Sequence, residues 1–163
     1  MKNIKIATLI HELTSIEELE HSDRTLIQKA REASKKAYAP YSEFKVGASV
    51  LLENGEIISG NNQENAAYPS GLCAERVALF YANAKFPDQK IIAMAIVARK
   101  SDQLTSLPVY PCGSCRQVMI ETEQKFQAPI RLILAGEDKI QVLDQVEQLL
   151  PMGFDKTLLL GKK

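Results

Sequence analysis

The sequence has no net charge, no long apolar run and few histidines. Its 163 residues carry 20 Lys and Arg against 20 Asp and Glu, and no dense basic run occurs. A nucleic-acid binder needs a basic face to displace counterions, so this balance argues against one. Apolar runs such as residues 91–98 fall well short of the roughly 20 residues that span a membrane. Residues 1–5 lack the continuous apolar core of a secretory signal.

Cysteine is also scarce, and its placement is informative. The chain has three cysteines, of which Cys112 and Cys115 form a Cys-x-x-Cys pair. This usage favours a metal site in a reducing compartment over disulfides, so we expect the cytoplasm. A closed structural zinc site would need a fourth ligand, and the two histidines, His11 and His21, both lie in the opening arm.

The third cysteine, Cys73, has a carboxylate two residues later, at Glu75. Three thiolates hold zinc while leaving its fourth position open, which is typical of a catalytic site. That position would carry a water, whose pKa zinc lowers to about 7. Glu75 is close to a ligand but not needed as one, so it is the natural proton carrier. If Cys112 and Cys115 were instead a redox pair, the spacing of Cys73 and Glu75 would be unexplained.

The first half of the chain predicts an arm, a helix and a hairpin. Residues 3–13 alternate as a strand does, and a capping box at 15–18 indicates a short helix. A longer helix is expected from Asp23, its N-cap, until Pro40 ends it, with an apolar stripe at Leu26, Ile27, Ala30, Ala33 and Ala37. Strands at 44–52 and 56–60 flank Asn54-Gly55, a strong hairpin signal. Residues 61–71 are polar and suit a loop that lines a site.

The second half alternates helices and strands. Helices are expected from Cys73 until Pro87 and again after Pro111, with strands at 91–98, 130–135 and 140–143. This alternation predicts a mixed sheet with helices on both faces. Both thiol segments would open a helix, whose free N–H groups stabilise thiolates. Arg76 and Arg116, each adjacent to a thiol, are expected to offset the negative charge from outside the ligand set.

Five blocks of sequence together resemble the cytidine deaminase family, in its small homotetrameric, three-cysteine form. The resemblance runs from about residue 37 to 154. The blocks are Tyr38-Ala-Pro-Tyr-Ser42, Phe44-Lys-Val-Gly-Ala48, Asn62-Gln-Glu-Asn-Ala-Ala-Tyr68, Cys73-Ala-Glu-Arg76 and Pro111-Cys-Gly-Ser-Cys-Arg-Gln117. The third block holds the pair that the resemblance assigns to ribose binding. The last two blocks hold the Cys-x-Glu and Pro-Cys-x-x-Cys signature of zinc deaminases.

The resemblance implies an enzyme of pyrimidine salvage that hydrolyses cytidine and 2′-deoxycytidine to uridine and 2′-deoxyuridine, releasing ammonia. Cys73, Cys112 and Cys115 would bind one zinc ion per chain. Glu75 would move a proton from the zinc-bound water to the base, and the resulting hydroxide would attack C4.

The resemblance also implies a set of substrate contacts and a fold. Asn62 and Glu64 would bind the ribose hydroxyl, and Phe44 would pack against the base. The main chain of Ala74 and Pro111 would contact the pyrimidine edge and the departing amine, and Phe154 would reach a neighbouring subunit's site. The fold would be α/β, a three-layer α/β/α sandwich with a mixed five-stranded sheet. The chain is then a single domain, with an arm at 1–22 and a catalytic core at 23–163.

Two departures and three alternatives accompany this resemblance. Asn61 stands where the family often has a cysteine that is not a ligand, and the arm is longer than in the shortest members. Phe44 and Phe154 are alternatively plain core residues of their own subunit. The same chemistry on another aminopyrimidine nucleoside, such as a nucleoside antibiotic, is the runner-up function. A non-catalytic zinc-binding interaction module is the alternative from another class, and Glu75 argues against it.

Overall fold

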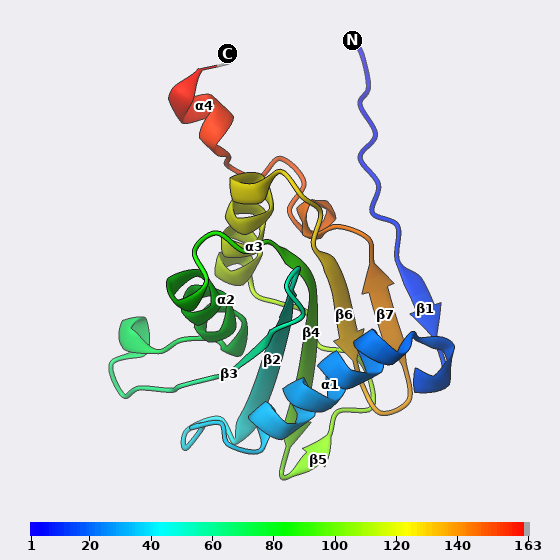
Figure 1. Ribbon diagram of the computed structural model, residues 1–163, viewed down its shortest axis with the longest axis vertical. Coiled ribbons are helices and arrows are strands. Elements are labelled where there is room, and N and C mark those ends of the chain that lie inside the picture. Colours follow the sequence, from blue (N-terminus) through cyan, green and yellow to red (C-terminus); the bar gives the residue numbers. More distant parts are fainter. Residues whose placement is uncertain (162–163) are drawn as a thin grey trace.

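A computed structural model describes residues 1–161 of the chain (Figure 1). Its main helices are α1 (His21–Ser34), α2 (Ala74–Lys85), α3 (Gly113–Phe126) and α4 (Lys156–Leu160). Its strands are β1 (His11–Leu13), β2 (Phe44–Leu52), β3 (Ile57–Asn61), β4 (Ile91–Lys100), β5 (Gln103–Leu104), β6 (Arg131–Ala135) and β7 (Ile140–Leu143). Short 3₁₀ turns lie at Ile16–Glu18, Tyr68–Ser70 and Val146–Leu149, the last labelled η3.

The strands form one mixed sheet in the order β1-β7-β6-β4-β2-β3, with β5 paired to β4. The β4–β6 pair is parallel and the others are antiparallel. The family resemblance implied five strands, whereas this sheet has seven. The two additional strands are the short β1 and β5, which extend the sheet beside β7 and β4.

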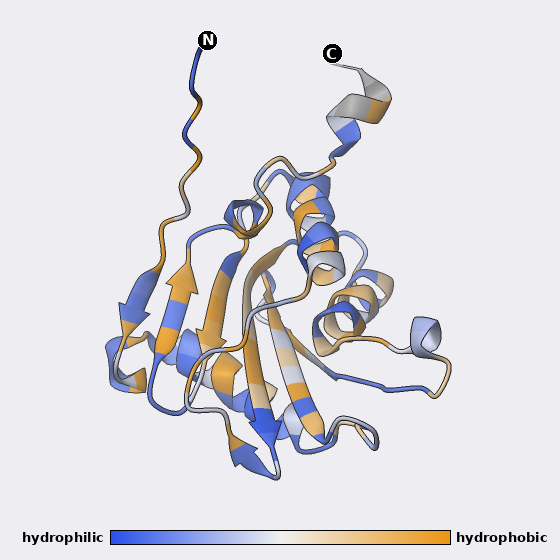
Figure 2. Cartoon of the chain, turned by 180° about the vertical axis from the view of Figure 1, so that it is seen from behind, coloured by the Kyte–Doolittle hydropathy of each residue, from blue (hydrophilic) through white to orange (hydrophobic). Residues whose placement is uncertain are grey.

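Helices cover both faces of the sheet, which confirms the expected α/β/α layers (Figure 1). On one face α1 buries Leu26, Ile27 and Ala30 against strand residues such as Val97. On the other face α2 and α3 bury a second cluster that includes Leu79, Met119 and Ile96. Figure 2 shows the central strands as the most hydrophobic part of the chain, as expected for strands covered on both sides.

The opening arm differs from the predicted strand at 3–13. Only His11–Leu13 pair with β7, and residues 1–10 are exposed (Figure 1). Alternation gives a segment the side-chain pattern of a strand, but a strand also needs a partner for its backbone groups, and β7 is only four residues long. The capping box at residues 15–18 is confirmed, because Ser15 and Glu18 exchange both bonds around the 3₁₀ turn.

Helix α1 begins earlier and ends earlier than predicted. Its N-cap is Glu20, so Asp23 lies inside the first turn, where it is buried and paired with Arg131. The helix ends at Ser34, well before Pro40, and Ala37 lies beyond the apolar stripe it was assigned to. The predicted hairpin is confirmed, with Gly55 at a φ of 86° in the turn between β2 and β3. No helix in residues 1–161 is long and apolar enough to cross a membrane.

Gly60 on β3 allows α2 to approach the sheet closely. A Cβ added there would lie 2.5 Å from the backbone nitrogen of Ala78 and 2.8 Å from the carbonyl oxygen of Ala74. Both atoms belong to the helix backbone, which cannot move aside as a flexible side chain does. The absence of a side chain at Gly60 therefore allows α2, which Cys73 precedes and whose first turn holds Glu75, to lie directly against β3.

We expect Gly60→Ala to lower the free energy of unfolding by about 1–3 kcal/mol, because the new methyl group forces α2 away from β3. Urea denaturation followed by circular dichroism measures this loss. Ser59→Ala on the same strand is the matched control, because Ser59 is exposed, and it should leave stability unchanged. Equal stability of the two variants would contradict the close approach.

Candidate metal centre and active site

The three thiols are brought together by two helix starts. Cys73 is the residue directly before α2, and Cys112 is the residue directly before α3. Cys115 lies in the first turn of α3 and is fully buried. The N–H groups in the first turn of a helix lack partners within the helix and carry partial positive charge. Both predicted helix starts are confirmed, and both favour the thiolate form that a metal requires.

The spacing of the sulfur atoms fits a tetrahedral zinc ion. The Sγ atoms of Cys73 and Cys112 are 3.8 Å apart, and those of Cys112 and Cys115 are 3.4 Å apart. All three lie within 4.8 Å of one another. A tetrahedron with Zn–S bonds of about 2.3 Å has edges of about 3.8 Å. The predicted ligands therefore form one cluster with a suitable donor set.

A guanidinium and neighbouring thiols adjust the charge of this cluster. Arg76 places Nη2 4.0 Å from the Sγ of Cys73. Hydrogen bonding from Cys115, helped by Arg76, lowers the pKa of Cys73 to about 5, although partial burial opposes this shift. The pKa of Cys115 is raised, because its thiol is bonded to Cys73 and is buried. Arg76 thus lies where it was predicted, beside a thiol.

Glu75 is a buried carboxyl group beside the thiols. It is 5% exposed, in the first turn of α2. Burial raises its pKa above the usual carboxyl range, and the negative charge of Cys73 adds to this effect. A carboxyl group with a raised pKa takes up and releases a proton near neutral pH more readily than an exposed one.

A cavity of about 300 Å³ lies against the thiols and Glu75. Four predicted substrate-binding residues line it, namely Phe44, Asn62, Glu64 and Ala74. Its lining also includes residues to which the sequence analysis gave no role, namely Ser42, Val46, Ile96, Val109 and Tyr110. Tyr110 directly precedes the Pro-Cys-x-x-Cys motif, and its aromatic side chain at that place was the signal that could have found it.

The side chain of Asn62 is bonded to the backbone of β2. Its Oδ1 accepts from the N–H of Val46 at 2.7 Å, and its Nδ2 donates to the carbonyl of Phe44 at 2.9 Å. The N–H of Val46 requires an acceptor, which fixes the orientation of the amide. Asn62 therefore ties the loop after β3 to the strand that carries Phe44.

Glu64 anchors the loop that precedes β2. It accepts from the N–H groups of Tyr41 and Ser42, at 2.9 and 3.3 Å, and from the hydroxyl of Ser42. These bonds, the Ser42 hydroxyl foremost, lower the pKa of Glu64. Its carboxylate therefore stays ionised at the mouth of the cavity.

Arg116 contacts the backbone on both sides of the site. Its Nε donates to the carbonyl of Pro111 at 2.9 Å, and its Nη1 donates to the carbonyl of Leu149 at 2.9 Å. These bonds attach the last residue of η3 to the residue that precedes Cys112, and the role of Arg116 in offsetting thiolate charge stays a prediction.

Pro111 and Phe154 lie outside the described lining of the cavity. Pro111 directly precedes Cys112, which does line it. The carbonyl of Phe154 accepts from Nε2 of Gln117 at 2.7 Å, and Phe154 is 55% exposed.

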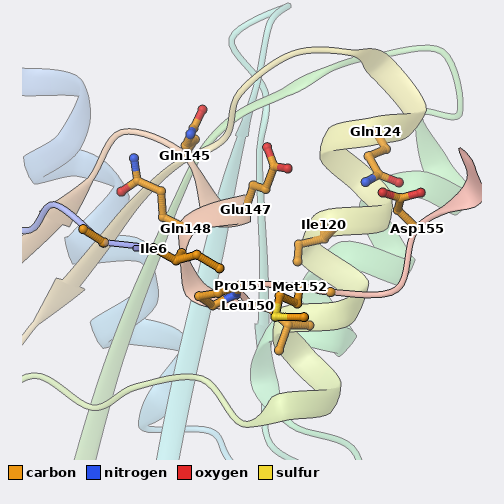
Figure 3. Close-up of a pocket in the computed structure, with 12 residues that line it drawn as sticks. Ile6, Ile120, Gln124, Gln145, Glu147, Gln148, Leu150, Pro151, Met152 and Asp155 are labelled. Atoms are coloured by element: carbon orange, nitrogen blue, oxygen red, sulfur yellow. The ribbon is translucent and has the colours of Figure 1, made fainter. Parts of the chain in front are cut away.

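A second cavity, of about 340 Å³, lies between the arm, α3 and the segment after η3 (Figure 3). Its described lining includes Ile6, Ile120 and Met152, together with several glutamines. It includes none of the predicted site residues, so the predicted chemistry belongs to the cavity beside the thiols.

The fold and the site define an α/β/α protein with an open, three-thiolate metal centre and a buried carboxyl group. Comparison with known proteins identifies its family. Residues 20–127 match the family model described as cytidine and deoxycytidylate deaminase zinc-binding region. The chain belongs to this zinc-binding deaminase family.

Individual relatives agree with this assignment. The chain is 48% identical over 96 residues to cytidine deaminase from Halalkalibacterium halodurans, covering 59% of this chain and 68% of that protein. It is 32% identical over 136 residues to a probable cytidine deaminase from Dictyostelium discoideum, covering 83% and 86% of the two chains. The crystal structure of cytidine deaminase from Burkholderia pseudomallei superposes with a TM-score of 0.70 at 38% identity, covering 83% of this chain and 100% of that one.

We expect the purified protein to hold about one zinc ion per chain, and Cys112→Ala to lose it. Because metal binding is coupled to folding, a chelator should lower the melting temperature of the wild type but not that of Cys112→Ala. Atomic emission and thermal denaturation measure the two effects. Ser114→Ala, in the same turn and exposed, is the control that should keep the metal. Full zinc content in Cys112→Ala would show that the cluster is not the site.

Proposed function

We propose that this protein deaminates cytidine and 2′-deoxycytidine by zinc-dependent hydrolysis, giving uridine and 2′-deoxyuridine with release of ammonia, as an enzyme of pyrimidine salvage. The observation that carries the proposal is Glu75, a buried carboxyl group beside three clustered thiols and a cavity. A structural zinc site has no use for such a group. Family membership and relatives named cytidine deaminase support the substrate.

Zinc bound by Cys73, Cys112 and Cys115 would supply the Lewis acidity that makes a water nucleophilic near neutral pH. Glu75 would take one proton from that water on its carboxylate oxygen and give it to the pyrimidine ring nitrogen, which keeps it in the product. It would then move a second proton, from the hydroxyl added at C4, to the amine. Its raised pKa suits both transfers, because a stronger base accepts the proton more readily and the carboxyl can still donate it. Ammonia then leaves from C4 as the carbonyl of the uracil ring forms.

The cavity residues would hold the nucleoside. Phe44 would pack against the base, and the main chain of Ala74 and Pro111 would contact its polar edge and the departing amine. Asn62 and Glu64 would bind the ribose. Their bonds to the backbone support this role, because they hold both side chains in place before substrate arrives. Asn62 keeps one N–H and Glu64 keeps lone pairs for a hydroxyl.

Assembly and location are further parts of the proposal. We expect a homotetramer with sites near subunit interfaces, in which Phe154 reaches a neighbouring site. Large exposed apolar residues support this arrangement, since Tyr68 is 80%, Met152 is 92% and Phe154 is 55% exposed. The three free cysteines favour a reducing compartment, and therefore the cytoplasm. Nucleic acid is not an expected partner because net charge is zero, and a membrane is not expected because the apolar runs are short.

Glu75→Ala should keep both fold and zinc while its turnover of cytidine falls by at least about a hundredfold, because the proton carrier is lost. The decrease in absorbance as cytidine is converted to uridine measures turnover, and metal analysis of the same sample measures zinc. Glu121→Ala, which removes an exposed carboxylate from α3, is the control. If Glu75→Ala turned over cytidine at the wild-type rate, the proton-carrier role would be wrong.

A further inference from the structure

Tyr110 is a cavity residue whose ring is held by a hydrogen bond to a side chain of β7. It lines the cavity beside the thiols and is 50% exposed. Its hydroxyl donates to Oε1 of Gln141 on β7, at 2.7 Å. A tyrosine ring has two rotatable bonds, so a bond at its far end limits where the whole ring can lie.

Gln141 is itself held by the opening arm. Its Nε2 donates to Oε2 of Glu12 on β1, at 3.0 Å. The other oxygen of Glu12 accepts from Nζ of Lys139 at 2.8 Å. These two bonds, that from Lys139 foremost, lower the pKa of Glu12, so its side chain is an ionised acceptor. A carboxylate only accepts, so the NH₂ group of Gln141 must face Glu12, and its oxygen is left to face Tyr110.

The sheet register builds this chain of contacts. Glu12 lies directly opposite Gln141 in the β1–β7 pair, Gln141 opposite Leu134, and Leu134 opposite Ile96. Residues directly opposite one another project from the same face of a sheet. Ile96 lines the cavity, so the row of side chains beneath the cavity continues across the sheet to Glu12.

Glu12 lies outside the residues that the family model matches. The family match starts at residue 20, after β1. The deaminase structure from Burkholderia pseudomallei is covered over its full length by 83% of this chain, so part of this chain has no counterpart there. The short strand β1 contributes a contact that reaches the cavity wall through Gln141.

We propose that Tyr110 contacts the bound nucleoside and that Glu12 and Gln141 are positioning residues that fix its ring, which gives the opening arm a part in substrate binding. The identity of the ligand as a nucleoside rests on the proposed function. The hydrogen bonds lie at the surface, where each contributes modestly. Their loss should therefore weaken substrate binding without abolishing turnover.

The kinetic test compares Tyr110→Phe and Glu12→Ala with the wild type. Each variant should raise the KM for cytidine about two- to tenfold, the worth of one hydrogen bond, with a much smaller change in kcat. The double variant should raise KM no more than the larger single effect, because both changes break the same chain of contacts. Glu12→Gln keeps an acceptor for Gln141 and should restore most of the affinity.

The matched control is Glu17→Ala, which removes another carboxylate of the arm that is paired with a cation, Arg24. It should leave KM unchanged. If Glu12→Ala left KM at the wild-type value, or if it lowered only thermal stability, the arm would have no part in binding and the proposal would be overturned. Additive effects in the double variant would show that Glu12 does not act through Tyr110, and would also overturn the proposal.

A binding readout separates this proposal from the reaction itself. The chain has no tryptophan, so Tyr110→Trp introduces a single fluorescent reporter at the cavity wall. Titration with uridine should change its emission saturably, and Glu12→Ala in the same background should not weaken this binding further, because tryptophan lacks the hydroxyl that bonds to Gln141. A fluorescence response without any cytidine turnover in the wild type would refute the proposed reaction but support the contact of residue 110 with the bound nucleoside. Unchanged emission in a variant that still turns over cytidine would overturn the role of Tyr110.

Discussion

The rest of this structure depends on three cysteine sulfur atoms that lie within 4.8 Å of one another and that a bound metal ion requires as thiolates. Like charges at such distances repel strongly where water is excluded, so the cluster requires a cation and positive surroundings. The two helix starts, the guanidinium of Arg76 and a zinc ion meet that requirement together. Burial, and after it the negative charge of Cys73, raises the pKa of Glu75, which connects the metal site to the proton carrier.

The fold brings residues that are distant in the sequence close together in space. Cys73 and Cys112 are 39 residues apart in the chain, yet their sulfur atoms are 3.8 Å apart. Strand β4 lies between α2 and α3 in the sequence. Both helices pack on the same core, which brings their first residues close together. Gly60 allows the close approach of α2, and Arg116 attaches the residue before Cys112 to the last residue of η3. The cavity is thus bordered by elements from most of the chain.

The sequence was most informative where chemistry is local. Both helix starts could be predicted from neighbouring residues, and the clustering of the three cysteines could be predicted from the Cys-x-Glu and Pro-Cys-x-x-Cys signature. The hairpin at Gly55 and the capping box at Ser15 followed for the same reason.

Features that depend on tertiary partners could not be predicted in this way. The alternating arm has the pattern of a long strand, but the length of β7 limits its pairing to His11–Leu13. Asp23 looked like an N-cap because its partner, Arg131, is distant in sequence. The contact from Glu12 to Tyr110 depends on strand register across three segments, and no local pattern encodes it.

The most direct test of the account is to determine, on one sample of reduced and chelator-free protein, both the zinc content and the rate of conversion of cytidine to uridine. The account predicts about one zinc per chain together with turnover, because an open three-thiolate site beside Glu75 serves catalysis. Zinc without turnover of cytidine or deoxycytidine would contradict the proposed reaction while leaving the metal site. Absence of zinc would contradict the account at its foundation.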